Sequence, residues 1–245
     1  MHLIGGGGTA LRSPVYNLLP VDLRTPPVVS LNPLLGSGDE PLLSPSLPTL
    51  LLFECVLAYM TPSASNALIQ WFVDYFRPPN GALLGAVIYE MFRLGDAFGR
   101  VMLNNLKVSF RSPSSSLPLL VAWEPSEYIW FRYLRQCRGV SLPGAEAYPD
   151  LASLPRRFLD LGFSAAQALT LREIRSKYIG PQQLQRLSQL EMLDEVEELE
   201  LVLDHYAISW GIKFPENWSR EGSDTWGLVT KNQTGSIDDG DDYGP

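Results

Sequence analysis

The stretch LPTLLLFECVLAYMTPSASNALIQWF, residues 47–72, contains the signals of a strand and a helix in direct succession. Its first half is an apolar run that carries one carboxylate, Glu54, and ends at Tyr59. A continuous apolar run of this kind is typical of a strand buried on both faces of a parallel sheet. Thr61 then offers a helix N-cap, Pro62 suits the first helical position, and apolar residues recur at spacings of three and four. We therefore predict a buried strand followed by an amphipathic helix.

The same arrangement recurs further along the chain. Residues 81–90, GALLGAVIYE, form a second apolar run that ends in a carboxylate, Glu90, and a helix-forming segment follows. A shorter apolar run, 15–24, is expected to form a short strand with Asp22 near its end. Buried strands that alternate with amphipathic helices predict an α/β fold with a doubly wound parallel sheet. Ligands of such sheets bind beyond the carboxyl ends of the strands, which is where Asp22, Glu54 and Glu90 would lie.

The C-terminal part of the sequence is predicted to be helical. Residues 151–174, LASLPRRFLDLGFSAAQALTLREI, indicate a helix, a turn at Gly162 and the start of a second helix. Ser188 and Glu191 have the spacing of a capping box. The segment that follows, LEMLDEVEELELVLDHYAISW, has an apolar stripe with acidic residues mostly off it, which predicts an amphipathic helix.

Composition excludes several classes of function. The 245 residues carry a net charge of −8 and no clustered basic face, so we expect no nucleic-acid partner. Two cysteines and two histidines supply no metal-ligand cluster, and Cys55 is expected to be a core thiol. The start of the sequence lacks the features of a signal peptide, and no apolar run is long enough to span a bilayer. We expect a cytoplasmic protein without a metal site or a membrane partner.

We predict a single domain over 1–245. Residues 25–46 are rich in Pro, Ser and Gly and are expected to form a loop. Residues 107–133 combine Ser, Pro and Trp without helical or strand periodicity and are expected to be an atypical insert. Residues 214–245, which include the run DDGDD, are expected to be a disordered acidic tail.

Several stretches together resemble one family, the leucine carboxyl methyltransferases. The matching stretches are SPVYNLLPVDLR, LPTLLLFECVLAYMTP, YEMFRLGDAFGRVMLNNL, LPGAEAYPDLASLPRRFLDLGF and LEMLDEVEELELVLDHYAISW, and they run in family order from about residue 13 to 213. These enzymes use S-adenosyl-L-methionine to methylate the C-terminal leucine carboxylate of the protein phosphatase 2A catalytic subunit. A sister branch, the methyltransferases of wybutosine formation in transfer RNA, shares the plan, but ECVLAYM and HYAISW look more like the phosphatase-directed branch.

The resemblance implies a Rossmann-like class I methyltransferase sheet with added helices, here lacking the family's N-terminal Gly-rich strand–loop–helix. It implies that Asp22 and Leu23 meet the adenine of S-adenosyl-L-methionine and that Glu54 faces the cofactor. A partly desolvated carboxylate at a strand end can pair with a cationic cofactor or accept a hydrogen bond from its amine. Tyr59 and Arg24 are further candidates for substrate binding, Arg24 because a basic residue would orient the substrate carboxylate.

No residue is expected to act as a chemical catalyst. A free α-carboxylate is already ionised at neutral pH, since its pKa is roughly 3.5, so the site needs to bind and align rather than to remove a proton.

Two classes of function stay open. The first is a protein carboxyl methyltransferase whose partner is the phosphatase C-terminal tail. The second is a non-catalytic remnant or interaction module of the same family, and the wybutosine branch is a further alternative.

Overall fold

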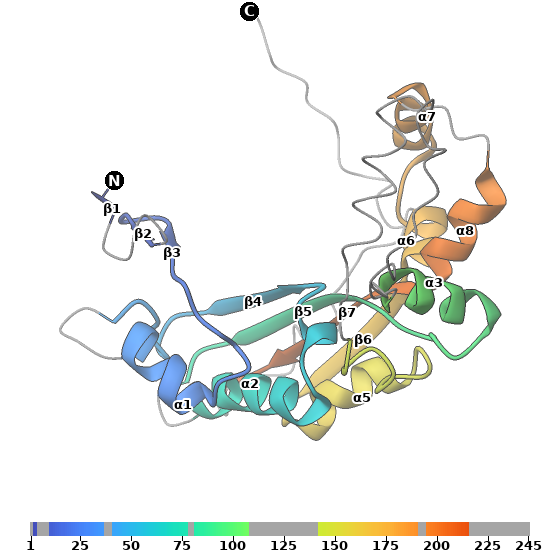
Figure 1. The fold of residues 1–245 in the computed structure, drawn as a ribbon. Helices are drawn as coiled ribbons and strands as arrows, with labels where there is room; N and C mark the ends of the chain where they lie inside the picture. The colour runs from blue at the N-terminus through green and yellow to red at the C-terminus, as the bar shows by residue number, and fades with distance from the viewer. Residues whose placement is uncertain are drawn as a thin grey trace, which may run out of the picture.

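The computed structural model describes residues 2–3, 10–36, 41–77, 81–107, 142–190 and 195–215 (Figure 1). Of the insert predicted at 107–133, only the first residue is described, as the end of a helix. Of the tail predicted at 214–245, only the first two residues are described, and Cys137 also lies outside the described residues.

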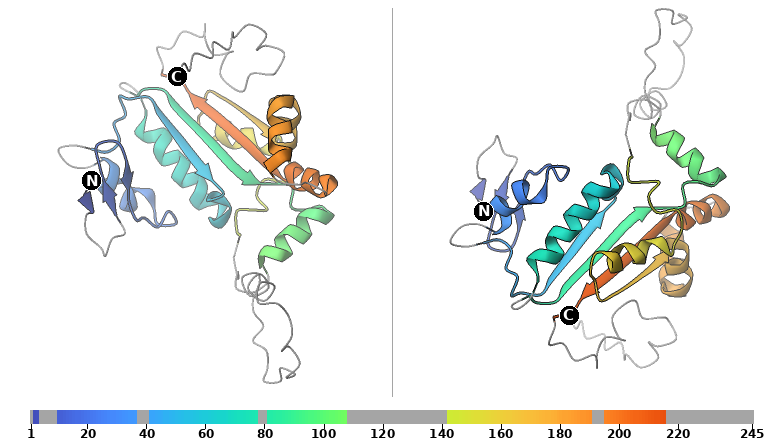
Figure 2. Two further views of the ribbon diagram at one scale, coloured as in Figure 1. Left: turned by 90° about the horizontal axis from the view of Figure 1, so that it is seen from above. Right: turned by 90° about the horizontal axis from the view of Figure 1, so that it is seen from below.

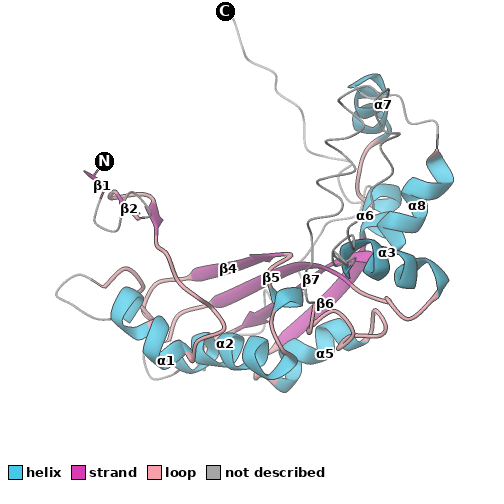
Figure 3. Ribbon diagram, viewed as in Figure 1, coloured by secondary structure: helices cyan, strands magenta, loops and turns pink. Residues whose placement is uncertain are grey.

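A four-stranded sheet forms the centre of the described fold (Figure 3). Its order is β4 (Thr49–Glu54), β5 (Leu84–Met91), β7 (Tyr206–Lys213) and β6 (Ala165–Thr170). β4 pairs in parallel with β5, whereas β7 is antiparallel to both of its neighbours. The α/β class and the parallel pairing of the two apolar runs are confirmed. The prediction of an all-parallel sheet is wrong, because β7 enters between β5 and β6 in the opposite direction.

The strand–helix unit predicted from residues 47–72 is present, but its strand ends at Glu54, earlier than the predicted end near Tyr59. α2 (Pro62–Tyr75) follows β4 through a short 3₁₀ turn, η3 (Leu57–Tyr59). The Thr61 side chain accepts a hydrogen bond from the backbone N–H of Ala64 at 3.3 Å, and Pro62 occupies the start of the helix, as predicted. α2 lies against the sheet on the same side as α5 (Ser153–Asp160) (Figure 1).

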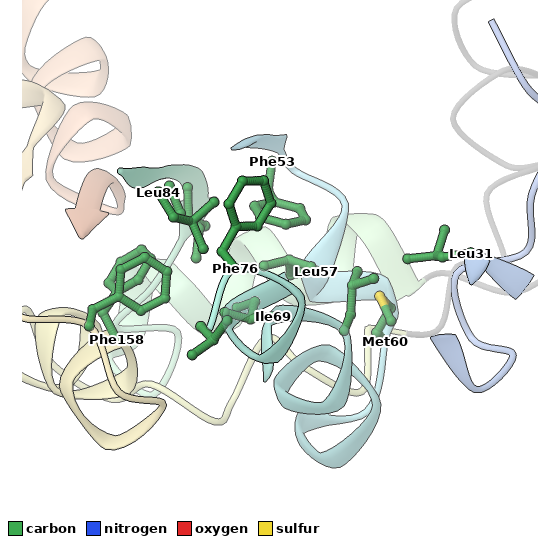
Figure 4. Close-up of a cluster of buried hydrophobic side chains, with 13 residues drawn as sticks. Leu31, Phe53, Leu57, Met60, Ile69, Phe76, Leu84 and Phe158 are labelled. Atoms are coloured by element: carbon green, nitrogen blue, oxygen red, sulfur yellow. The ribbon is translucent and has the colours of Figure 1, made fainter. Parts of the chain in front are cut away.

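The main core lies between the sheet and these two helices. Its members are large apolar side chains with almost no exposed surface, and each contributes roughly 1.5–3 kcal/mol by leaving water. Figure 4 shows them converging from several elements: Phe53, Leu57, Met60, Ile69, Phe76, Leu84 and Phe158. Gly211 of β7 is required here, because a Cβ at this position would lie 2.7 Å from the ring of Phe158.

β4 is not buried on both faces, and that prediction is wrong. Phe53 is 8% exposed, but Leu50 and Leu52 on the opposite face are 62% and 69% exposed. The physical reason is position: β4 is at the edge of the sheet that the described residues form, and these residues leave the face that carries Leu50 and Leu52 exposed. An apolar run in the sequence does not reveal which of its two faces has a neighbour.

A strand, β6, forms where the sequence predicted the start of a helix. Residues 165–170 form β6, where the sequence indicated the start of a helix after Gly162. The predicted turn is present, with Gly162 at a φ of +92°. A capping box does begin the next helix, α6 (Leu171–Lys177), in which Thr170 accepts from the backbone of Glu173 and Glu173 accepts from Thr170. The helix therefore starts later than predicted.

The last predicted helix is also shorter in the structure. α8 (Val196–Asp204) is helical, but the HYAISW segment belongs mostly to β7. Ser188 lies inside α7 (Pro181–Leu190), where its hydroxyl donates to the carbonyl of Gln185, so it does not cap the following helix. Glu191, its predicted partner, lies outside the described residues.

The N-terminal segments are mostly turns. The run 15–24 contains only a two-residue strand, β3 (Asn17–Leu18), which pairs with β2 (Leu11–Arg12) beside β1 (His2–Leu3). The predicted loop at 25–46 includes two short helical segments, α1 (Pro27–Ser30) and η2 (Asn32–Gly36).

At the other end of the sheet, α3 (Ala97–Lys107) follows β5, as predicted, and lies near α8 (Figure 2). Within the described ranges, no helix has both the length and the apolar character needed to cross a bilayer.

Candidate functional site

A hollow of about 230 Å³ lies between the turn that follows β3 and the loop that follows β4. It is lined by Val21, Asp22, Leu23, Arg24, Val56, Tyr59 and Met60. Four of the five residues predicted to bind cofactor or substrate therefore come together, although they lie about 35 positions apart in two groups. Glu54 is not part of the lining.

The first wall of the hollow is a tight turn at Asp22. The backbone carbonyl of Asp22 accepts from the N–H of Thr25 at 3.1 Å, and its Oδ1 accepts from the N–H of Arg24 at 3.0 Å. An Asp side chain that accepts from the backbone two residues later stabilises such a turn. The Arg24 guanidinium also donates two hydrogen bonds to the carboxylate, from Nε to Oδ1 at 2.9 Å and from Nη2 to Oδ2 at 2.9 Å. These hydrogen bonds lower the pKa of Asp22 to about 2, so the carboxylate is ionised at physiological pH.

The second wall begins with a strained residue. Cys55 has a φ of +51° directly after β4, while its N–H still donates to the carbonyl of Tyr89 at 2.8 Å. This left-handed conformation turns the chain sharply out of the strand and is uncommon for a residue with a side chain. Burial, followed by Glu54 and Glu90, raises the pKa of the Cys55 thiol, so it is protonated at neutral pH and is a poor nucleophile. Cys55 is only partly buried, and its assignment as a core thiol is therefore wrong.

The loop after Cys55 separates buried from exposed side chains. Leu57 and Ala58 are buried, whereas Tyr59 is 48% exposed and faces the hollow. Gly144 packs against this loop, since its N–H donates to the carbonyl of Ala58 at 3.0 Å. A Cβ at Gly144 would lie 2.6 Å from the carbonyl oxygen of Leu57. The loop geometry thus depends on a close backbone approach that only glycine allows.

Glu54 lies outside the hollow, on the exposed face of β4. It is exposed, so the expectation of a partly desolvated carboxylate is not met. Its neighbour in the parallel register is Tyr89, whose ring centroid lies 5.5 Å from that of Tyr206. Burial, with smaller effects from Cys55 and Glu54, raises the pKa of Tyr89, so its phenol is neutral. An exposed carboxylate therefore lies beside one partly buried phenol, that of Tyr89, at the carboxyl end of β4.

Glu90 is part of a buried network and is not available to a ligand. Its Oε1 accepts from Nη1 of Arg157 at 3.1 Å, and the side chains are 6% and 2% exposed, respectively. Burial raises the pKa of Glu90, and Arg157 opposes that rise. Arg157 also lies 4.7 Å from the centre of the Tyr148 ring and donates from Nε to Asn66 at 3.3 Å. The pair joins β5, α5 and α2, so its role is structural.

Sequence reasoning missed the apolar part of the hollow. Val21, Val56 and Met60 supply its walls, but each reads as an ordinary apolar residue beside a predicted site residue. Tyr89 and Tyr206 were also missed, because their proximity depends on the insertion of β7 next to β5. Adjacency to the predicted residues was the only signal that pointed to the apolar walls.

Comparison with known proteins identifies similar chains. A leucine carboxyl methyltransferase 1 from Cryptococcus neoformans is 40% identical over 220 residues, covering 86% of this chain and 52% of that protein. The Bos taurus protein of the same name is 32% identical over 206 residues, covering 84% of this chain and 50% of that protein. A tRNA wybutosine-synthesizing protein 4 from Rattus norvegicus is 33% identical over 193 residues, covering 79% of this chain and 22% of that protein.

The chain spans about half the length of the leucine carboxyl methyltransferases that it matches. No protein-family model matches the chain. The similarity extends over more than four fifths of the chain.

Proposed function

Because the chain belongs to the leucine carboxyl methyltransferase family, we propose that it serves S-adenosyl-L-methionine-dependent methyl esterification of a C-terminal leucine carboxylate. The proposed substrate is the C-terminal tail of the protein phosphatase 2A catalytic subunit. The observation that carries the proposal is the hollow, which gathers Asp22, Leu23, Arg24 and Tyr59 in one place.

The residues of the hollow fit the adenine end of the proposed cofactor. Val21, Leu23, Val56 and Met60 offer apolar surface for a planar base, which is the usual character of a small-molecule site. Asp22 is ionised and can accept a hydrogen bond from an exocyclic amine. When bound, S-adenosyl-L-methionine supplies an electrophilic methyl group on a positively charged sulfur.

Glu54 fits a different part of the same cofactor. Its exposed carboxylate, beside the neutral phenol of Tyr89, would attract a cationic group at the carboxyl end of β4. An aromatic face adds roughly 0.5–2 kcal/mol of attraction for a cation. Glu54 therefore contributes to binding in this proposal although it does not line the hollow.

The substrate carboxylate needs no general base, since it is already ionised at neutral pH. The protein's contribution is to bring the carboxylate oxygen and the methyl group into line, and alignment of this kind reaches effective molarities of about 10⁵ M or more. In this proposal Tyr59 contacts the substrate tail, and its 48% exposure in the lining of the hollow supports that role. Arg24 offers the substrate only those N–H groups that Asp22 does not use.

The binding test is calorimetric titration of the chain with S-adenosyl-L-methionine. We expect saturable binding that both Asp22→Asn and Glu54→Ala weaken. Glu197→Ala is the matched control, because Glu197 is an exposed carboxylate on α8 and should leave the titration unchanged. The absence of saturation up to about 10 mM, or Asp22→Asn and Glu54→Ala variants that bind like the unmodified chain, would contradict the proposal.

The activity test uses the full chain with two peptides that share the phosphatase C-terminal sequence. One ends in a free leucine carboxylate and the other in a leucine amide, and transfer of a labelled methyl group is measured. Transfer to the acid alone supports carboxyl methylation. Transfer to a transfer RNA instead would assign the chain to the wybutosine branch, and cofactor binding without transfer to any acceptor would favour the non-catalytic alternative.

A further inference from the structure

The Asp22 carboxylate is almost fully occupied by Arg24. A carboxylate has about four acceptor sites, two on each oxygen. Oδ1 accepts from the backbone N–H and from Nε of Arg24, at 3.0 and 2.9 Å, and Oδ2 accepts from Nη2 at 2.9 Å. Both sites on Oδ1 are thus used, and one of the two sites on Oδ2 is left.

These bonds hold the carboxylate in one orientation at low entropic cost. Arg24 is only two residues from Asp22, and its backbone and side chain bind the same carboxyl group. A guanidinium that engages both oxygens of a carboxylate fixes its plane, which a single point charge does not do. The side chains of Asp22 and Arg24 are 53% and 73% exposed, so the pair is reachable from the hollow that it helps to line.

We infer that Arg24 is a positioning residue: it fixes the carboxylate of Asp22 so that one acceptor site on Oδ2 remains for a ligand. The hollow then recognises a planar base through a single N–H donor. This inference rests on the proposed function, in which Asp22 contacts the base. It assigns to Arg24 a role different from orienting the substrate carboxylate.

Two chemical consequences follow. A base with a carbonyl in place of the amine would bring an acceptor against an acceptor and should bind poorly. A base whose amine carries one N–H should bind as well as a base whose amine carries two, because only one acceptor site is left. The Asp22–Arg24 pair has no net charge, so this side of the hollow selects by hydrogen-bond pattern rather than by charge.

The first test needs no ligand. In the full chain, ¹³C NMR of the Asp22 carboxyl group is followed as a function of pH. We expect a midpoint near 2 in the unmodified protein and a rise toward 3.8 in Arg24→Met, since the hydrogen bonds from Arg24 lower the pKa. Arg77→Met is the matched control, because Arg77 pairs with Asp74 in α2 and should not change the Asp22 titration. An unchanged Asp22 midpoint in Arg24→Met would overturn the inference.

The second test uses adenosine and its analogues as probes, with binding followed by NMR chemical shifts. We expect N6-methyladenosine to bind like adenosine, and N6,N6-dimethyladenosine and inosine to bind about tenfold more weakly. Arg24→Met and Arg24→Lys should each weaken adenosine by about tenfold, because a lysine does not engage both oxygens. A merely electrostatic role of Arg24 would be rescued by lysine, and that result would overturn the positioning role.

The outcomes separate this inference from the proposed function. If Asp22→Asn abolishes adenosine binding while Arg24→Met leaves it unchanged, Asp22 acts alone, and only the inference fails. If N6-methyladenosine binds as weakly as the dimethyl analogue, both N–H groups are read, and the single acceptor site is wrong. If adenosine binds equally to the unmodified chain and to Asp22→Asn, the placement of the base in this hollow fails.

Discussion

Removal of the Arg157 guanidinium should destabilise the fold severely. In Arg157→Met, Glu90 stays in the interior, 6% exposed, without the guanidinium nitrogen that now lies 3.1 Å from it. Breaking a buried ion pair by removing one partner costs about 3–5 kcal/mol, because an uncompensated charge remains. In a chain of 245 residues each kcal/mol corresponds to roughly 2–4 °C, so Tm should fall by about 6–20 °C.

The pH dependence of this variant provides a second readout. Burial already raises the pKa of Glu90 in the folded protein, and loss of Arg157 removes the interaction that opposes the rise. A carboxyl group whose folded pKa lies above its unfolded value loses stability as pH rises, because ionisation favours the unfolded chain. Arg157→Met should therefore be more stable near pH 5 than near pH 7, with a larger difference than in the unmodified protein.

Urea unfolding monitored by circular dichroism, at pH 5 and pH 7, measures both effects. The double variant Glu90→Gln/Arg157→Met is the control. It removes the unpaired buried carboxylate and should recover at least half of the lost free energy of unfolding. A cost below about 1 kcal/mol for Arg157→Met, or a double variant as unstable as the single one, would refute the reasoning.

Three further predictions concern other parts of the fold. Gly211→Ala should cost about 1–3 kcal/mol in urea unfolding, because its Cβ would lie 2.7 Å from Phe158; an unchanged midpoint would contradict this packing. Asp96→Ala should cost about 1 kcal/mol, since Asp96 caps α3 by accepting from Gly99. The pKa of Asp96 is lowered by that bond and by His205, so the stability it adds should be lost below about pH 4; an unchanged acid profile in Asp96→Ala would contradict this. Leu52→Lys should change stability by less than about 0.5 kcal/mol while raising solubility, and a larger loss would mean that the exposed face of β4 is covered.

The elements that sequence reasoning predicted correctly are those with strong local signals. α2 has an N-cap, a proline at its start and a regular apolar face, and all three act within a few residues. β5 is a long apolar run, and both of its faces have neighbours. β6 and β7 were missed because their sequences, AAQALT and YAISWGIK, become strands only through pairing with each other and with β5.

The candidate site likewise has features that local sequence patterns predict and features that depend on long-range packing. The turn at Asp22 and the loop to Tyr59 are local features, and the resemblance to a family singled out residues in both. The turn and the loop face one another because residues 21–24 pack near residues 56–60. No local sequence pattern predicts that packing. The engagement of Asp22 by Arg24 is likewise a matter of side-chain geometry, and basic residues near acidic ones are too common in sequences to predict it.

The position of β7 has a consequence for the order of folding. It is the last of the described strands in the chain, yet it lies between β5 and β6, which have no pairing with each other in the sheet. The register joins Tyr89 to Ile208 and Leu169 to Ile208, so residues separated by more than a hundred positions must meet before the sheet is continuous. Long-range pairing of this kind is slow, because the closure of a large loop precedes any stabilising contact. During synthesis, β6 would have no partner strand until the residues of β7 have been made. Until then, the edges of β5 and β6 that pair with β7 stay open, and chaperones can bind them or they can pair wrongly.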